Sequence, residues 1–151
     1  MKRFKFSLQA VHLVRESKCD TAERELVFAT RELGRAHDEL SDVLRQRQAA
    51  VDAYLALHQA QPVQAPTMAA HMDYIGALLE RERQARKAIS NHERNVAAKR
   101  EALIEASRQA ETTANLRERQ RERYQQEVAR DEQKMLDELA VSAVARRLSN
   151  N

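Results

Sequence analysis

Apolar residues recur at every seventh position between residues 19 and 57. One series reads Cys19, Leu26, Leu33, Leu40, Arg47 and Tyr54, and a second reads Ala22, Ala29, Ala36, Val43, Ala50 and Leu57. The two series are separated alternately by three and four residues, which is the spacing of a coiled-coil seam. Because the second series is mostly alanine, this stretch predicts a long helix that a partner helix can approach closely.

A break in the pattern follows at residues 59–67, which contain Pro62 and Pro66. Proline removes a backbone donor and disfavours the helical conformation of the residue before it, whereas Thr67 is a suitable N-cap for a following helix. Beyond the break, good helix formers continue to about residue 147 without another proline. The sequence therefore predicts a helix over about 7–60, a turn over about 61–67 and a helix over about 68–147.

The second predicted helix has two apolar edges of its own. A strong edge contains Ile75, Ile89, Val96, Leu103, Ala110 and Tyr124, and a weaker edge contains Met72, Leu79, Ala114, Val128 and Met135. A short connection between long amphipathic helices makes them antiparallel neighbours.

Antiparallel pairing is best satisfied when the numbers of facing residues sum to 129. This register places Leu33 beside Val96, Arg47 beside Glu82 and Glu32 near Lys99, and it centres the turn between the two prolines. About twenty residues of the second helix then extend beyond the first. The predicted fold is all-α, a single elongated domain (residues 1–151) formed by a long antiparallel two-helix coiled-coil hairpin with a C-terminal helical overhang.

Composition agrees with this fold and excludes several others. In 151 residues, 32% are charged, 4% are aromatic and only two are glycine, so the chain cannot fill a thick globular core. The net charge of +3 is too small to imply nucleic acid by itself. A single cysteine excludes an intramolecular disulfide, the N-terminus is a poor signal peptide, and no apolar run approaches the roughly 18 residues of a membrane span. We expect a soluble, cytoplasmic protein.

No pattern of residues predicts catalysis. The sequence has no glycine-rich phosphate loop, no nucleophile elbow and no metal motif such as CxxC or HExxH. In the proposed register His37 is level with His92, and His58 with His71, but each pair occupies opposite flanks of the seam. We therefore expect no enzyme activity, no catalytic residue, no cofactor and no metal site.

The two chain ends carry the candidate binding residues. Arg117, Arg119, Arg121 and Arg123 form the densest basic run. The run is either a solvated helix face or, together with Lys2, Arg3 and Lys5 at the N-terminus, a basic collar that suits an acidic protein surface or nucleic acid.

Phe4, Leu8 and Val11 follow helical spacing but sit one residue off the heptad edge, which His12 and Arg15 occupy, so Phe4 and Phe6 lie where little partner surface is available within the chain. The two phenylalanines either cap the end against Tyr124 and Val128 or anchor another protein.

Apolar residues also gather on the overhang and near the turn. The overhang carries Met135, Leu136 and Leu139, and an isolated helix of its length is marginal in water, so we expect it to fray until a partner orders it. Near the turn, Tyr54 and Met72 lie on the predicted seam and close the hairpin. The remaining apolar side chains at this tip, Leu55, Tyr74 and Leu78, are candidates for a contact with a partner.

Both ends resemble one protein family. The segment Arg3-Phe4-Lys5-Phe6-Ser7-Leu8, followed by Val11 and Arg15-Glu16, resembles the opening of the flagellar FliJ proteins. The segment Asp137-Glu138-Leu139-Ala140, with Arg146-Arg147 beyond it, is similar to the C-terminal segment of that family. His12 departs from the leucine that is usual at its position.

The resemblance implies a chaperone-like coupling component of the flagellar type III export apparatus, which serves motility. It implies an antiparallel coiled coil similar to the stalk of rotary ATPases, with both termini inserted into the ring of the export ATPase FliI and a contact to the export gate protein FlhA. Export chaperones are further candidate partners, and these partners would hold the protein peripherally at the inner membrane. On this view the ATPase contacts are Phe4, Phe6, Leu8, the four arginines of the basic run, Met135, Leu136 and Leu139, and the gate contacts are Leu55, Tyr74 and Leu78.

Two alternatives remain open at this point. One is the equivalent stalk protein of a virulence type III secretion system, or injectisome, which has the same shape. The other is a coiled coil that binds nucleic acid through its arginines. Glu118 and Glu122, which alternate with those arginines, and the lack of aromatic residues between them argue against nucleic acid.

Overall fold

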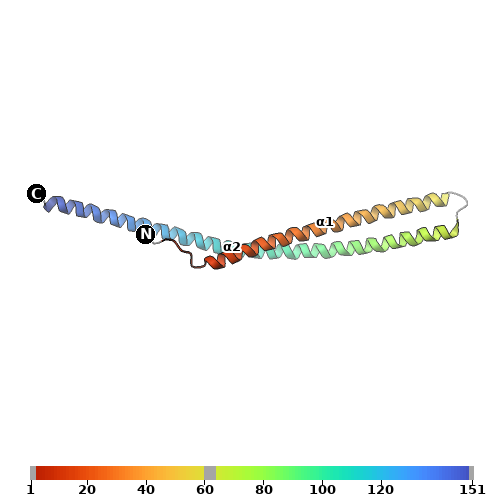
Figure 1. Cartoon of the computed structure of the whole chain (residues 1–151), viewed down its shortest axis with the longest axis horizontal. Helices are drawn as coiled ribbons and strands as arrows, with labels where there is room; N and C mark the ends of the chain where they lie inside the picture. Colours follow the sequence, from red (N-terminus) through yellow and green to blue (C-terminus); the bar gives the residue numbers. More distant parts are fainter. Residues whose placement is uncertain (1–2, 60–63, 150–151) are drawn as a thin grey trace. The chain divides into compact units, whose positions relative to one another are not determined.

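A computed structural model describes residues 3–59 and 64–149, with side chains through residue 146. Two helices, α1 (Gln9–Gln59) and α2 (Ala65–Ser149), make up almost all of this part of the chain and pack against each other as a helical hairpin (Figure 1). No strand occurs among the described residues. The predicted all-α hairpin is confirmed.

The contacts between the helices fall into two units. The first, here called the hairpin unit, comprises Asp20–Glu105, and the second, here called the end unit, comprises Met1–Cys19 and Ala106–Asn151. Whether the chain behaves as a single domain, as the sequence suggests, stays a prediction. No helix in the described part of the chain is both long and apolar enough to span a bilayer.

Each helix begins slightly away from its predicted position, for a local reason. The amide of Gln9 donates to the carbonyl of Phe6 and that of His12 to the carbonyl of Leu8, so α1 starts two residues late, after a turn. At α2, the amides of Thr67 and Met68 donate to the carbonyl of Gln64 at 3.1 and 3.3 Å. Thr67 therefore lies inside the first turn and is not the N-cap. Pro66 fits in the same turn, because the first amides of a helix have no intrahelical partner to lose.

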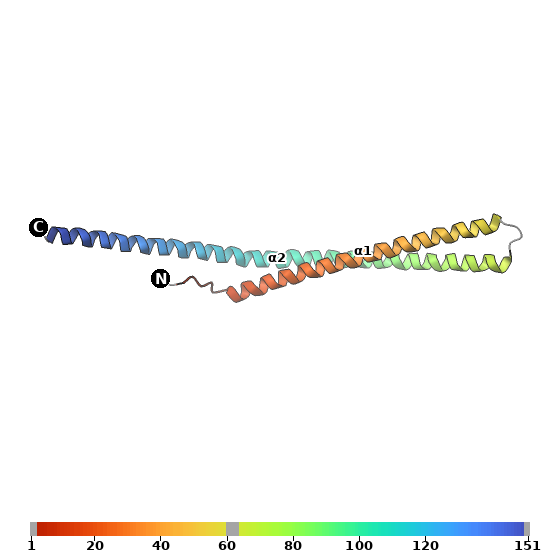
Figure 2. The same cartoon turned by 45° about the horizontal axis from the view of Figure 1, so that its top comes forward.

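Figure 2 shows α1 and α2 side by side in the hairpin unit, and the burial of residues along α1 there confirms its heptad pattern. The alanine-rich series is the more deeply buried of the two, with Ala29 and Val43 each only 1% exposed. The leucine-rich series from Leu26 to Tyr54 is half-buried throughout. Small side chains on the central line let the two backbones approach closely, while the larger leucines cover the sides of the contact.

The stronger edge of α2 is also confirmed, but the weaker edge is wrong by one residue. Ile89 and Val96 of the strong edge are buried, whereas Met72 and Leu79 are about half exposed. The second edge follows residues 71, 78, 85, 92, 99, 106, 113 and 120, all of which are buried or half-buried. Leu78, which is 1% exposed, occupies the core position that the pattern assigned to Leu79.

Charged side chains confirm one pair that the antiparallel register predicts and replace another. Arg47 of α1 donates to Glu82 of α2 at 2.5 Å, which is the predicted pair, and Arg86 donates to the other carboxylate oxygen at 2.7 Å. The Glu82 side chain is 11% exposed, whereas those of Arg47 and Arg86 are 34% and 61% exposed, so the carboxylate is largely buried and the two arginines reach the surface. On the flank, Lys99 pairs with Glu25 at 2.8 Å and not with Glu32, which binds Arg35.

Candidate partner-binding site

In the end unit, residues 3–8 precede α1 and pack on α2 without forming a helix. Phe6 is 5% exposed, and its ring meets the ring of His12 edge-on with centroids 6.3 Å apart. Phe4 is half-buried against Tyr124, with centroids 5.6 Å apart. Phe4 thus contacts Tyr124, as the capping alternative expects, whereas the ring contact of Phe6 is with His12. Whether either phenylalanine also contacts a partner stays a prediction. Leu8 is 39% exposed and remains on the surface.

A polar pair replaces the apolar seam next to this segment. Nδ1 of His12, which is 4% exposed, lies 3.2 Å from the hydroxyl of Thr113, which is 3% exposed. The Thr113 hydroxyl in turn donates to the carbonyl of Ala110 at 2.9 Å. Nε2 of His12 lies 3.4 Å from Glu16. The buried histidine is thus hydrogen-bonded at one ring nitrogen and faces a carboxylate at the other, so its burial is compensated.

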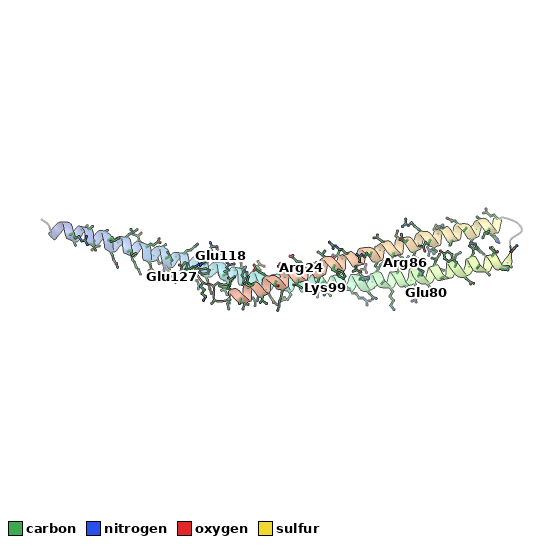
Figure 3. The ribbon with its side chains drawn as sticks, viewed as in Figure 1. Arg24, Glu80, Arg86, Lys99, Glu118 and Glu127 are labelled. Carbon is green, nitrogen blue, oxygen red and sulfur yellow. The ribbon has the colours of Figure 1, made fainter. Side chains whose placement is uncertain are left out.

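The basic run lies on exposed turns of α2, as the sequence predicts for either interpretation. All four of its arginines are exposed, and Glu118, labelled in Figure 3, lies among them. Among the described residues, Arg123 is the arginine of the run that lines a surface cavity with Arg3 and Lys5, whereas Lys2 lies outside the described residues. A surface cavity of about 400 Å³ is lined by Arg3, Lys5, Arg123, the Phe4–Tyr124 ring pair, Gln120 and Glu127.

That cavity has a distinct chemical character. Three cationic side chains and one carboxylate surround a pair of aromatic rings, so it favours an acidic segment that can also place an apolar group on the rings. Arg117, Arg119 and Arg121 do not line it. The predicted collar therefore forms in part, with Arg123 as the member contributed by the basic run.

Beyond the N-terminal segment, α2 continues as the overhang, here residues 129–149. Every side chain from residue 129 to residue 146 is exposed. Met135, Leu136 and Leu139 are 67%, 61% and 65% exposed, and Val141 and Val144 are also more than half exposed. An apolar surface of this kind on a protruding helix is typical of a surface that binds another protein. Whether this end frays in the free protein stays a prediction.

In the hairpin unit, the predicted contact residues near the turn differ in their exposure. Leu55 and Tyr74 are each 51% exposed, in keeping with a surface role. Leu78 is instead a core residue, so its assignment to the surface is wrong, for the reason that the second edge of α2 runs through residue 78. Tyr54 stacks on His58 with centroids 6.4 Å apart, while Met72, expected on the seam, is 54% exposed.

The electrostatics of the described residues show one strongly perturbed carboxyl group. Glu80 accepts hydrogen bonds from Arg83 and Gln84 on the next turn of α2, and these lower its pKa to about 2. The same contact raises the pKa of Arg83. Because the pair lies on the solvent-exposed surface of the helix, we interpret it as support for the helix and not as a reaction centre. Among the described residues, no group of three potential metal ligands comes together.

Sequence reasoning missed two features, one in the end unit and one in the hairpin unit. The first is the hydrogen bond between His12 and Thr113. Thr113 belongs to the second edge of α2, which the sequence pattern placed one residue away. The position of His12 was a usable signal, because it lies on the heptad series seven residues before Cys19. The exposed Phe28 was also missed. It lines a cavity with Arg24 and Lys99, both labelled in Figure 3, and is 65% exposed.

Comparison with known proteins identifies one similarity. A family model described as the flagellar FliJ protein matches residues 4–149. No curated protein and no solved structure matches the chain. The match includes both terminal segments and the whole of the hairpin.

Proposed function

This chain belongs to the flagellar FliJ protein family, a non-catalytic component of the flagellar type III export apparatus, and we propose that it couples the export ATPase to the export gate. The observation that carries this proposal is the overhang, a stretch of α2 whose apolar side chains are exposed. The family supplies the identity of the ATPase, FliI, and of the gate protein, FlhA. Exposed apolar side chains on the overhang and near the turn of the hairpin unit support these two proposed contacts.

The overhang is the principal contact proposed for the ATPase. Burying Met135, Leu136 and Leu139 in a partner contributes roughly 5 kcal/mol before the cost of ordering the helix. A contribution of this size suits a reversible contact that other groups must strengthen. Leu8 and the arginines of the basic run lie on the same unit and are available for this purpose.

The roles of the two phenylalanines are revised in this proposal. Phe6 is buried beneath its own chain, and Phe4 packs on Tyr124, so neither is a free anchor. We propose that they position the N-terminal segment. Arg3 and Lys5 then stand beside Arg123, where they would meet an acidic rim on the ATPase.

Deleting residues 133–151 tests the ATPase contact. We expect the hairpin unit to melt as in the full chain, because its core lies in residues 20–105, while binding to FliI and stimulation of its ATPase activity are lost. A truncated chain that binds and stimulates at the level of the full chain would refute the contact.

A finer test keeps the chain length unchanged. Met135, Leu136 and Leu139 are replaced together by serine, and the matched control replaces Val27, Phe28 and Ile104 of the hairpin unit, which are 50%, 65% and 51% exposed. Only the first variant should lose ATPase binding. Equal losses in both would indicate general surface stickiness.

Electrostatic steering by the basic run has its own signature. Arg119→Glu combined with Arg123→Glu should chiefly slow association with FliI, and the difference should shrink at high salt, because screening removes steering. A change in dissociation alone, unaffected by salt, would contradict this role.

The gate contact is assigned to the tip of the hairpin unit, now without Leu78. Leu55→Ala with Tyr74→Ala should weaken binding to FlhA and leave helicity unchanged, since both side chains are exposed. Val27→Ala with Ile104→Ala is the control, as those residues are equally exposed but distant in sequence from the turn. Wild-type binding by the tip variant would remove the tip from the proposal.

A further inference from the structure

A heptad seam that begins at Val128 continues through the overhang. Val128, Glu132, Met135 and Leu139 are separated by four, three and four residues and therefore share one face of α2. Arg146 lies seven residues after Leu139 on that face. From residue 129 onward, each described side chain on this face is exposed.

The hairpin unit shows how this chain treats opposite charges on a seam. Arg47 and Glu82 both occupy seam positions, on helices that run in opposite directions, and they bond at 2.5 Å between apolar layers. Their neighbours along the seam include Val43, Ala50 and Leu78, which are buried. A charged seam residue is thus accommodated when an opposite charge faces it across an antiparallel pair.

The seam of the overhang also carries one acidic and one basic residue, with apolar residues between them, and their order is self-complementary. Residue 139 is the midpoint between Glu132 and Arg146. An antiparallel second copy that places Leu139 against Leu139 therefore sets Glu132 opposite Arg146 twice, once at each end. The same arrangement sets Met135 level with Ala143. Parallel copies would instead oppose like charges at both positions, which is unfavourable.

From this pattern we propose that the overhang binds the overhang of a second copy of this chain, antiparallel and centred on Leu139. The pairing covers Met135 and Leu139 and places two symmetric Glu132–Arg146 ion pairs at its ends. Arg146 already has an interaction within its own chain, so the new pair supplements or replaces it. This surface overlaps the one proposed for the ATPase, so self-pairing and ATPase binding would compete.

Charge reversal in the full chain tests the pairing, with self-association followed by sedimentation equilibrium. We expect a dissociation constant on the order of 10–100 µM, since the covered surface is small. Glu132→Arg should weaken association about tenfold, because two ion pairs become two repulsions, and Arg146→Glu should do the same. The double variant, in which the charges are exchanged, should recover most of the loss.

Asp137→Arg is the matched control, because Asp137 lies on the opposite face of the helix, where it accepts a hydrogen bond from Gln133. It should leave association unchanged. Circular dichroism establishes that every variant keeps its helices. A wild-type chain that stays monomeric at concentrations well above this range, or a double variant as weak as either single variant, would overturn the proposal.

The direction of pairing is tested with cysteines after Cys19→Ser. A chain carrying Glu132→Cys is mixed with one carrying Arg146→Cys under mild oxidation. Antiparallel pairing should yield mainly mixed disulfide dimers, whereas parallel pairing yields dimers of each variant with itself. Val141→Cys, on the opposite face, should form few dimers. Efficient dimers through residue 141, or a predominance of self-paired products, would contradict the geometry.

Discussion

The hairpin unit and the end unit contain segments of the same two helices, yet the inward faces of those helices are covered by different kinds of residue in each unit. In the hairpin unit, alanine, valine and leucine repeat along the seam, and one ionic layer at Glu82 interrupts it. In the end unit the seam contains the His12–Thr113 pair, a short non-helical segment covers part of α2, and residues 129–146 of α2 are exposed. We infer from this difference that residues 20–105 contain most of the stabilising core, and the exposed apolar side chains of the end unit support the proposal that it binds partners.

The largest expected difference between the units comes from trimming one leucine in each. Leu78→Ala removes a fully buried side chain and should lower the free energy of unfolding by about 3 kcal/mol. Leu139→Ala trims an exposed side chain and should change it by less than about 0.5 kcal/mol. Urea denaturation followed by circular dichroism measures both. Similar losses for the two variants would mean that the overhang is packed in solution.

The ionic layer of the hairpin unit should have the next largest effect. Glu82→Gln keeps the size of the side chain but removes the charge that Arg47 and Arg86 share, so we expect a loss of about 1–2 kcal/mol. The same denaturation experiment applies, with Glu93→Gln as the control because Glu93 is exposed. A wild-type unfolding midpoint would show that the layer sets the register without stabilising it.

The polar pair of the end unit should have a smaller and more local effect. Thr113→Val removes the hydroxyl beside His12 and should cost about 1 kcal/mol, because a buried ring nitrogen loses its partner. Amide hydrogen exchange should speed up near residues 9–15 and remain unchanged in residues 29–50. Faster exchange throughout residues 20–105 would contradict the separation of the two units.

Much of this architecture could be predicted because the heptad series of α1 is continuous and the break at Pro62 and Pro66 is sharp. The second edge of α2 could not be predicted in the same way. Leu78 and Leu79 are adjacent and equally apolar, so only the position of α1 decides which of them is buried. The Arg47–Glu82 layer was predictable because the opposite charges fall at one level of an independently chosen register.

The packing of the N-terminal segment was only half determined by its sequence. The heptad edge passes through His12, a polar residue. This indicates that the apolar seam ends near residue 12, but it does not indicate how the N-terminal segment packs. The hydroxyl that satisfies His12 comes from Thr113, which is 101 residues away in the sequence. Such a pair depends on how α1 and α2 meet in the end unit, and no local pattern encodes it.

The smallest effect expected concerns the pH dependence of the hairpin unit. The pKa of Glu80 falls from 4.5 to about 2 in the folded chain, so the folded state favours its ionised form. The resulting stabilisation is fully present above pH 4.5 and is lost as the pH falls toward 2. Glu80→Gln should therefore lower the thermal midpoint slightly at pH 7 and leave it nearly unchanged at pH 2. A larger effect at pH 2 than at pH 7 would have the wrong sign.

The division between a stabilising hairpin unit and a partner-binding end unit is tested most directly by hydrogen exchange with and without the export ATPase. On addition of FliI, we expect new protection in the end unit, within residues 117–146, and little change in residues 20–105. Protection that appears mainly in residues 20–105, with the overhang exchanging as in the free chain, would contradict the account.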